Sequence, residues 1–150
     1  MAQVTTRLNQ HWTRERPGNL TMVVDDAAND SDKTLTVPTG EIWELRHVLV
    51  DLATSADVGN RQMRLILGDG VGSCAYMNAL NVQAESTQEY YNFGIEYDAV
   101  TEAPAGYHFL PLPLRFAPAG FTIRAYDTAG IAAAADDMRL RALVNVYPSN

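Results

Sequence analysis

The sequence predicts an all-β domain: an antiparallel β-sandwich, jelly-roll-like, with about eight strands and an extended N-terminal arm. Three segments favour this fold class because apolar and polar residues alternate along them, which places every second side chain on one face of a sheet. These segments are residues 61–67, 121–126 and 138–147. No segment has the length and pattern of a crossover helix, which argues against an α/β fold.

The first 33 residues differ in composition from the rest. They are mostly polar and charged, they contain the breaker Pro17-Gly18, and their one apolar run is residues 20–24. Residues 25–32 are typical of an acidic loop. The sequence therefore predicts an arm over residues 1–33, with at most one edge strand, and a sandwich domain over residues 34–150.

Strands are expected wherever β-branched, aromatic and alternating residues lie between turn signals. They are residues 34–37, 42–52, 61–67, 74–77, 82–84, 87–93, 112–116, 121–126 and 138–147. Turns or loops rich in Pro, Gly and Asn are expected between them. They are the turns at 38–40 and 117–120, a hairpin turn at 57–60, a hairpin or loop at 68–72 and a long loop at about 94–106. Residues 131–135 have helical propensity, but they are too few for more than one turn.

The side chains of the core follow from the alternation. In the last strand Met138, Leu140, Ala142, Val144 and Val146 share one face. Tyr90 and Tyr91 are neighbours, so they point to opposite faces and only one of them is buried. Four aromatic residues are expected in the core: Trp43, Phe93, Phe116 and Phe121.

Length and charge limit the classes of protein. With 150 residues, 47% of them hydrophobic, the chain suits one globular domain. Asp and Glu number 18 against 11 Lys and Arg, a net charge of −7, which disfavours nucleic acid as a partner. No apolar run is long enough for a bilayer, and the start does not resemble a secretory signal, so we expect a soluble, cytoplasmically made protein with no membrane partner. Cys74 is the only cysteine and is expected to be a small packing residue.

No catalytic centre, cofactor site or metal site is predicted. His11, His47 and His108 are isolated, and the nucleophile-elbow, P-loop and dinucleotide-binding motifs are absent. The pair Asp136-Asp137 is interpreted as a turn before the last strand. The acidic segment 25–32 lacks the spacing of an EF-hand, so a solvated loop is favoured over calcium, which stays an alternative. We therefore expect no enzymatic activity.

The arm holds the residues predicted to bind a partner. Trp12 lies in a polar segment with no local core to enter, and exposed tryptophan is typical of protein interfaces or sugar-stacking surfaces. The basic residues near it are Arg7, Arg14 and Arg16. Because such a segment orders on a partner, we expect these four residues to anchor the arm.

Several motifs resemble those of small virion proteins of tailed bacteriophages. They are TVPTGEIWEL at residues 36–45, VGNRQ at 58–62, LPLP at 110–113, PAG at 118–120 and DDM at 136–138. The likeness covers about residues 34–147, and its motifs are structural rather than catalytic. The resemblance implies a jelly-roll-like subunit of a phage particle, of the capsid cement or decoration type, that binds the major capsid protein or other virion subunits.

Three functions are therefore weighed, of which an enzyme is the least favoured. The first is a non-enzymatic structural protein of the virion, assembled in the host cytoplasm, that stabilises the capsid. The alternative is a carbohydrate- or receptor-binding module on a phage head or tail appendage. A dimer or trimer is expected because a small sandwich has edge strands that need pairing or protection. Removal of residues 1–30 is expected to abolish capsid attachment and to leave the fold and melting temperature nearly unchanged.

Overall fold

The computed structural model describes residues 18–27, 31–95, 97, 105–131 and 134–149. All regular secondary structure in these ranges is β-strand, which confirms the predicted all-β class. The strands are β1 (Asn19–Asp25), β2 (Asp32–Thr36), β3 (Glu41–Ala53), β4 (Met63–Gly68), β5 (Ser73–Asn78), β6 (Gln88–Gly94), β7 (Tyr107–Pro111), β8 (Phe116–Pro118), β9 (Thr122–Asp127) and β10 (Asp137–Pro148). Within the described ranges, no helix has the length and apolar character needed to cross a membrane.

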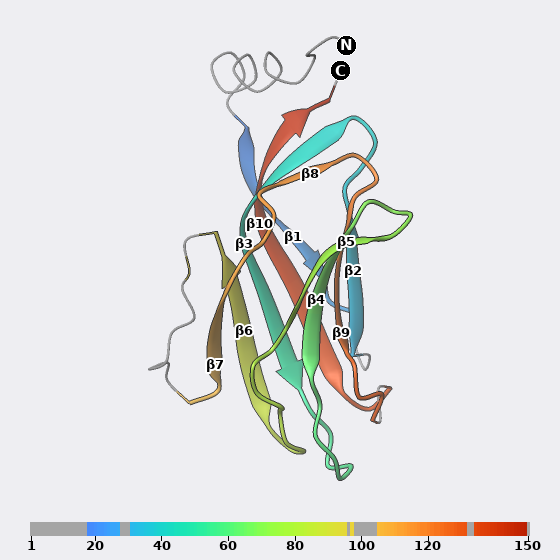
Figure 1. Ribbon diagram of the computed structural model, residues 1–150, viewed down its shortest axis with the longest axis vertical. Coiled ribbons are helices and arrows are strands. Elements are labelled where there is room, and N and C mark those ends of the chain that lie inside the picture. Colours follow the sequence, from blue (N-terminus) through green and yellow to red (C-terminus); the bar gives the residue numbers. More distant parts are fainter. Residues whose placement is uncertain (1–17, 28–30, 96, 98–104, 132–133, 150) are drawn as a thin grey trace.

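The strands form two sheets that pack face to face (Figure 1). The six-stranded sheet has the order β1-β10-β3-β6-β7, and β8 pairs with the first part of β3. The four-stranded sheet has the order β2-β9-β4-β5. All pairs are antiparallel except β6 and β7, which are parallel.

The pairing follows the nested pattern of a jelly roll. β4 pairs with β5, β3 with β6, β2 with β9 and β1 with β10, so each pair encloses the previous one along the chain. Rolling up such a long hairpin produces two four-stranded sheets. Strands β7 and β8 are an insertion between β6 and β9, and both extend the sheet that contains β3. The predicted sandwich is confirmed.

The core lies between the sheets and is built by the alternation visible in the sequence. In β10, Met138, Leu140, Ala142 and Val144 are fully buried. β4 and β9 contribute in the same way, with their alternate apolar residues turned inward. The prediction of core aromatic residues is confirmed for three of four: Trp43, Phe93 and Phe121.

Several local predictions are wrong. Phe116 lies on the short strand β8 with 48% of its surface exposed. Residues 112–115 are not a strand, because the chain leaves β7 at Pro111 and re-enters the sheet only at β8. The segment at 82–84 forms one isolated bridge, between Gln83 and Arg61. Cys74 is exposed on the edge strand β5 rather than packed.

The predicted hairpin at residues 57–60 is also wrong. The turn joins β3 to β4, but β3 belongs to the six-stranded sheet and β4 to the other, so the segment crosses between sheets. The glycine-rich segment 68–72 does form a hairpin, since β4 and β5 pair from Arg64 opposite Asn78 to Gly68 opposite Ser73.

Part of the segment predicted as an arm lies in the sheets. Of residues 1–33, the structure describes 18–27 and 31–33. β1 runs beside β10 in continuous register, from Asn19 opposite Val146 to Asp25 opposite Leu140. It is the edge strand of the larger sheet, and β2 begins at Asp32, before Thr34.

A buried ion pair ties the crossing segment to the start of β10. Arg61 and Asp136 are both fully buried, with Nε of Arg61 2.9 Å from Oδ2 of Asp136. The other four N–H groups of the guanidinium donate to the carbonyls of Asp57 and Gly59, to Oγ of Ser55 and to Oδ1 of Asp136. All five donors of the guanidinium are therefore satisfied. Asp136 is the last residue of the turn before β10, and it is held there by a charge pair that the sequence did not indicate.

Candidate ligand-binding face

A bulge in β3 places two polar residues side by side on the outer face of the larger sheet. Opposite β10, Leu143 pairs with His47 and Val144 with Leu45, so Arg46 is an extra residue in the ladder. A β-bulge of this kind redirects side chains and is frequent near functional sites. Arg46 and His47 consequently both line one pocket.

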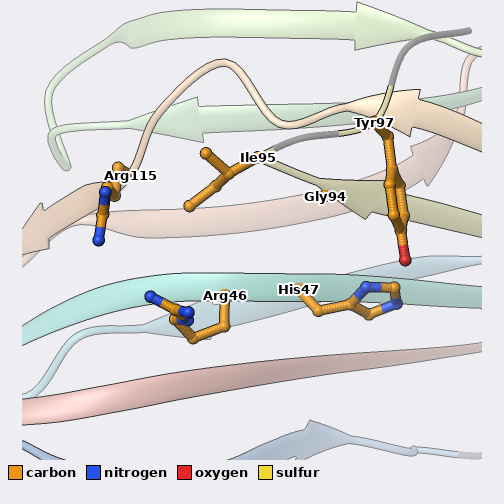
Figure 2. Close-up of a pocket in the computed structure, with 6 residues that line it drawn as sticks. All are labelled: Arg46, His47, Gly94, Ile95, Tyr97 and Arg115. Carbon is orange, nitrogen blue, oxygen red and sulfur yellow. The ribbon is translucent and has the colours of Figure 1, made fainter.

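The pocket has a volume of about 260 Å³ and is open to solvent. Its lining comes from β3, from the end of β6 and from the segment before β8: Arg46, His47, Gly94, Ile95, Tyr97 and Arg115. Figure 2 shows the guanidinium groups of Arg46 and Arg115 at one end, and the rings of His47 and Tyr97 at the other. The pocket thus has a cationic end and an aromatic end.

Glu44 holds the cationic end together. Its Oε1 accepts hydrogen bonds from Nη1 of Arg46 at 3.2 Å and from Nε of Arg115 at 2.8 Å, and Nη2 of Arg115 also donates to it. Its Oε2 accepts from Asn145 and from the hydroxyl of Tyr147, at 2.9 and 3.0 Å. Burial raises the pKa of Glu44, but these hydrogen bonds outweigh burial and lower it to about 2. Two guanidinium charges and one carboxylate charge leave a net charge of +1.

The aromatic end of the pocket depends on a glycine. Gly94 has no side chain, and a Cβ built on it would lie 2.8 Å from the ring of Tyr97. The Tyr97 ring therefore approaches the backbone of β6 closely. It makes edge contacts with His47 and Phe109, at centroid distances of 5.8 and 5.5 Å. Burial lowers the pKa of His47, with a hydrogen bond to Asn92 opposing it, so this ring is neutral at pH 7.

More rings continue from the pocket along β6 and β7. Tyr90 and Tyr107 are opposite each other in the parallel ladder and stack at 4.9 Å between centroids, and Tyr107 is 43% exposed. Tyr90 lies four residues before Gly94, which is about 13 Å along a strand. We call Tyr90, Tyr107, Phe109 and Tyr97 the aromatic strip.

The outer face of the four-stranded sheet carries a different arrangement. The guanidinium of Arg64 lies over the rings of Tyr76 and Tyr126, at 5.6 and 5.8 Å from their centroids. Arg124 lies over Tyr126 and forms an ion pair with Asp32. These side chains cover one another across β5, β4, β9 and β2.

The four residues predicted to bind a partner, Arg7, Trp12, Arg14 and Arg16, lie outside the described residues. Of the acidic segment, Asp25 accepts a hydrogen bond from the backbone of Thr34, and Asp26 pairs with Arg139. Among the described residues, no group of three or more His, Cys, Asp or Glu side chains is arranged to hold a metal ion. Calcium binding by this segment stays an untested alternative.

Sequence reasoning did not identify the pocket. The sequence shows His47 only as an isolated histidine within a strand, and it predicts a loop at about 94–106 and a strand at 112–116. Arg115 is 71 residues from Glu44, and only the folded sheet brings them together. Of the neighbours Tyr90 and Tyr91, Tyr91 is the buried one, with its hydroxyl bonded to Gln83 and Glu89, so it offers no surface to a ligand.

No protein-family model and no curated protein matches this chain. Among solved structures, an exo-beta-agarase has 10% identity and a TM-score of 0.37, over 90% of this chain and 23% of the agarase. Dimeric latent PorU from Porphyromonas gingivalis has 10% identity and a TM-score of 0.38, over 87% of this chain and 13% of PorU. A family 11 carbohydrate-binding module from Clostridium thermocellum has 9% identity and a TM-score of 0.25, over 91% and 92% of the two chains. The chain spans about a quarter or less of the agarase and of PorU, and TM-scores below 0.5 do not establish a shared function.

Proposed function

We propose that the protein is a carbohydrate-binding module that holds a saccharide on the outer face of its six-stranded sheet. The observation that carries this proposal is the aromatic strip, which leads directly into an open polar pocket. Binding sites for small molecules combine ring surfaces with a few polar groups in a concavity. This face has both, and they lie within a few residues of each other on neighbouring strands.

The chemistry of a sugar fits this combination. A sugar ring presents C–H groups on its faces and hydroxyls at its edges, so it packs on an aromatic ring and still needs hydrogen-bond partners. Tyr90 and Tyr107 offer ring surface, and each also has a hydroxyl. His47, Tyr97 and Arg46 supply polar groups in the pocket.

Replacement of Tyr107 by alanine is expected to weaken saccharide binding about tenfold, because it removes one half of the stacked tyrosine pair. A glycan array identifies the saccharide, and titration calorimetry measures the affinity. Tyr76→Ala is the matched control, since Tyr76 is exposed on the outer side of the opposite sheet. Loss of binding in Tyr76→Ala alone would move the site to that sheet, and an array with no binding at all would refute the module.

A structural role in a phage particle, which the sequence resemblance implies, is a second candidate function. The observation that favours it is the outward side of β1, where Leu20, Met22 and Val24 are 63%, 53% and 48% exposed. They alternate along an edge strand, which has both unpaired backbone groups and apolar surface to offer another chain. Such an edge suits contact with a second copy or with a virion subunit.

We expect the purified protein to sediment as a dimer or trimer at tens of micromolar. The triple variant Leu20→Thr, Met22→Thr, Val24→Thr keeps β propensity but removes the apolar surface, so it should shift toward monomer. Circular dichroism checks that the β spectrum is retained. A wild-type protein that is strictly monomeric would contradict self-association through β1.

A further inference from the structure

The cationic end of the pocket holds more hydrogen-bond donors than its own carboxylate uses. A guanidinium has five N–H donors. Among the described residues, Arg46 donates one hydrogen bond, to Glu44, and its side chain is 46% exposed. Arg115 donates through Nε and Nη2 to the same Oε1 and is 52% exposed. Both groups therefore retain donors that face solvent at the pocket.

The buried Glu44 restrains these two guanidinium groups before any ligand binds. Glu44 is only 5% exposed in its side chain and is itself held by Asn145 and Tyr147, so it cannot turn away to follow a ligand. The bulge sets the direction of Arg46 from the backbone of β3. A ligand that binds here does not need to order these side chains, which reduces the cost of binding.

The charge of the site differs in sign from that of the chain. The protein carries −7, whereas Arg46, Arg115 and Glu44 together carry +1. Arginine recognises planar or tetrahedral oxyanions through two parallel N–H donors, with stronger hydrogen bonds than neutral groups form. Among the described lining residues, the aromatic end adds only the neutral His47 ring and the Tyr97 hydroxyl, so Arg46 and Arg115 carry the positive charge of this lining.

We infer that the saccharide of this module is acidic, and that Arg46 and Arg115 bind its anionic substituent, a carboxylate or a sulfate ester. This inference rests on the proposed carbohydrate-binding function. The substituent enters the cationic end of the pocket, which lies opposite Tyr97 in Figure 2, and the sugar rings extend past Tyr97 along the rest of the aromatic strip.

The test compares charged saccharides with neutral forms of the same backbone. The probes are an oligogalacturonate and its methyl ester, and a sulfated galactan oligosaccharide and its desulfated form, each titrated calorimetrically against the full chain. We expect one charged probe to bind at least tenfold tighter than its neutral form, with an affinity that falls as NaCl rises. Which charged probe binds distinguishes carboxylate from sulfate.

Two substitutions connect this preference to the pocket. Arg46→Gln is expected to weaken binding of the charged probe about tenfold and to weaken binding of the neutral form much less, because Gln still offers a hydrogen-bond donor, and Arg115→Gln is expected to do the same. Arg124→Gln is the control: Arg124 is 45% exposed, ion-paired with Asp32 and located on the opposite sheet. It should bind the charged probe as the wild type does.

The possible outcomes distinguish failure of the anionic preference from failure of the proposed carbohydrate-binding function. If charged and neutral probes bind equally, Arg46→Gln has no effect and Tyr107→Ala still weakens both, the anionic preference is refuted and the carbohydrate module stands. If Arg124→Gln lowers the affinity as much as Arg46→Gln does, the preference is a general charge effect and the pocket assignment is refuted. If no saccharide binds, the module itself is refuted.

Discussion

Replacing Asp136 by alanine is expected to lower the free energy of unfolding by about 3–5 kcal/mol. The change leaves the Arg61 guanidinium buried, charged and without its carboxylate. It also removes the acceptor for the backbone N–H of Ser55, which lies 2.7 Å from Oδ1 of Asp136. Urea unfolding followed by circular dichroism measures the loss.

Asp137→Ala is the control for this experiment, because Asp137 is the next residue and is exposed. A surface carboxylate contributes little, so the control should lose less than about 1 kcal/mol. Equal losses for the two variants would show that the buried pair adds nothing specific. A variant in which Arg61 and Asp136 are both replaced by apolar residues should recover part of the stability, since it leaves no unpaired charge.

Two buried carboxyl groups, those of Asp136 and Glu44, determine the direction of the pH dependence of stability. Burial alone would raise the pKa of both groups, but their hydrogen bonds outweigh burial. The pKa of Asp136 is therefore lowered, and the pKa of Glu44 is lowered to about 2. A carboxyl with a lowered folded-state pKa stabilises the protein above its unfolded pKa, and this contribution is lost as pH falls through the folded value. We expect Asp136→Ala to flatten the decline in stability below the unfolded value of 3.8.

Deletion of residues 1–26 is expected to destabilise the domain by roughly 3–5 kcal/mol, in contrast to the sequence expectation of an unchanged melting temperature. The deletion removes β1, whose seven residues pair with β10. At about 1 kcal/mol net for each backbone hydrogen bond, several such bonds account for a loss of this size. Val23, which packs on the core from β1, is lost as well. Calorimetric melting of the purified proteins measures the change.

A shorter deletion, of residues 1–17, separates attachment from stability. It removes Arg7, Trp12, Arg14 and Arg16 and leaves every described strand pair in place. We expect it to melt as the full chain does. If the longer deletion also melts unchanged, β1 contributes nothing to the sandwich and the sequence-based boundary at residue 34 is the better one.

The fold was predictable because its strongest signal is local. A strand with one buried face must alternate, and the alternation of β4, β9 and β10 could be read directly from the sequence. No local pattern in the sequence indicates which of the two sheets a strand belongs to. The turn at residues 57–60 has a composition typical of a hairpin, yet the chain there crosses between sheets, because β3 and β4 find their partners elsewhere in the sequence.

The candidate site was not predictable for a related reason. Arg46 and His47 share the outer face because of a bulge, which depends on register with β10 and has no residue signature here. Tyr97 and Arg115 fall in segments without alternation, and their neighbours come from β3 and β6. The buried pair of Arg61 and Asp136 joins residues 75 apart in sequence. Which of these charged residues are buried, and which charges they meet, depends on how distant strands pair, so no short segment of the sequence indicates it.

The nested order of strand pairs also has a consequence for the way the chain folds. β4 and β5 are separated by four residues and can meet early, whereas β1 and β10 join segments more than 110 residues apart. Closing a longer loop costs more entropy unless the inner pairs have already shortened it, so the pairs are expected to form from the inside outward. The pair between the first and the last strand, β1 and β10, would then form last and open first. The backbone edge of β10 that pairs with β1 in the native state would therefore be the surface that a partly folded chain exposes longest.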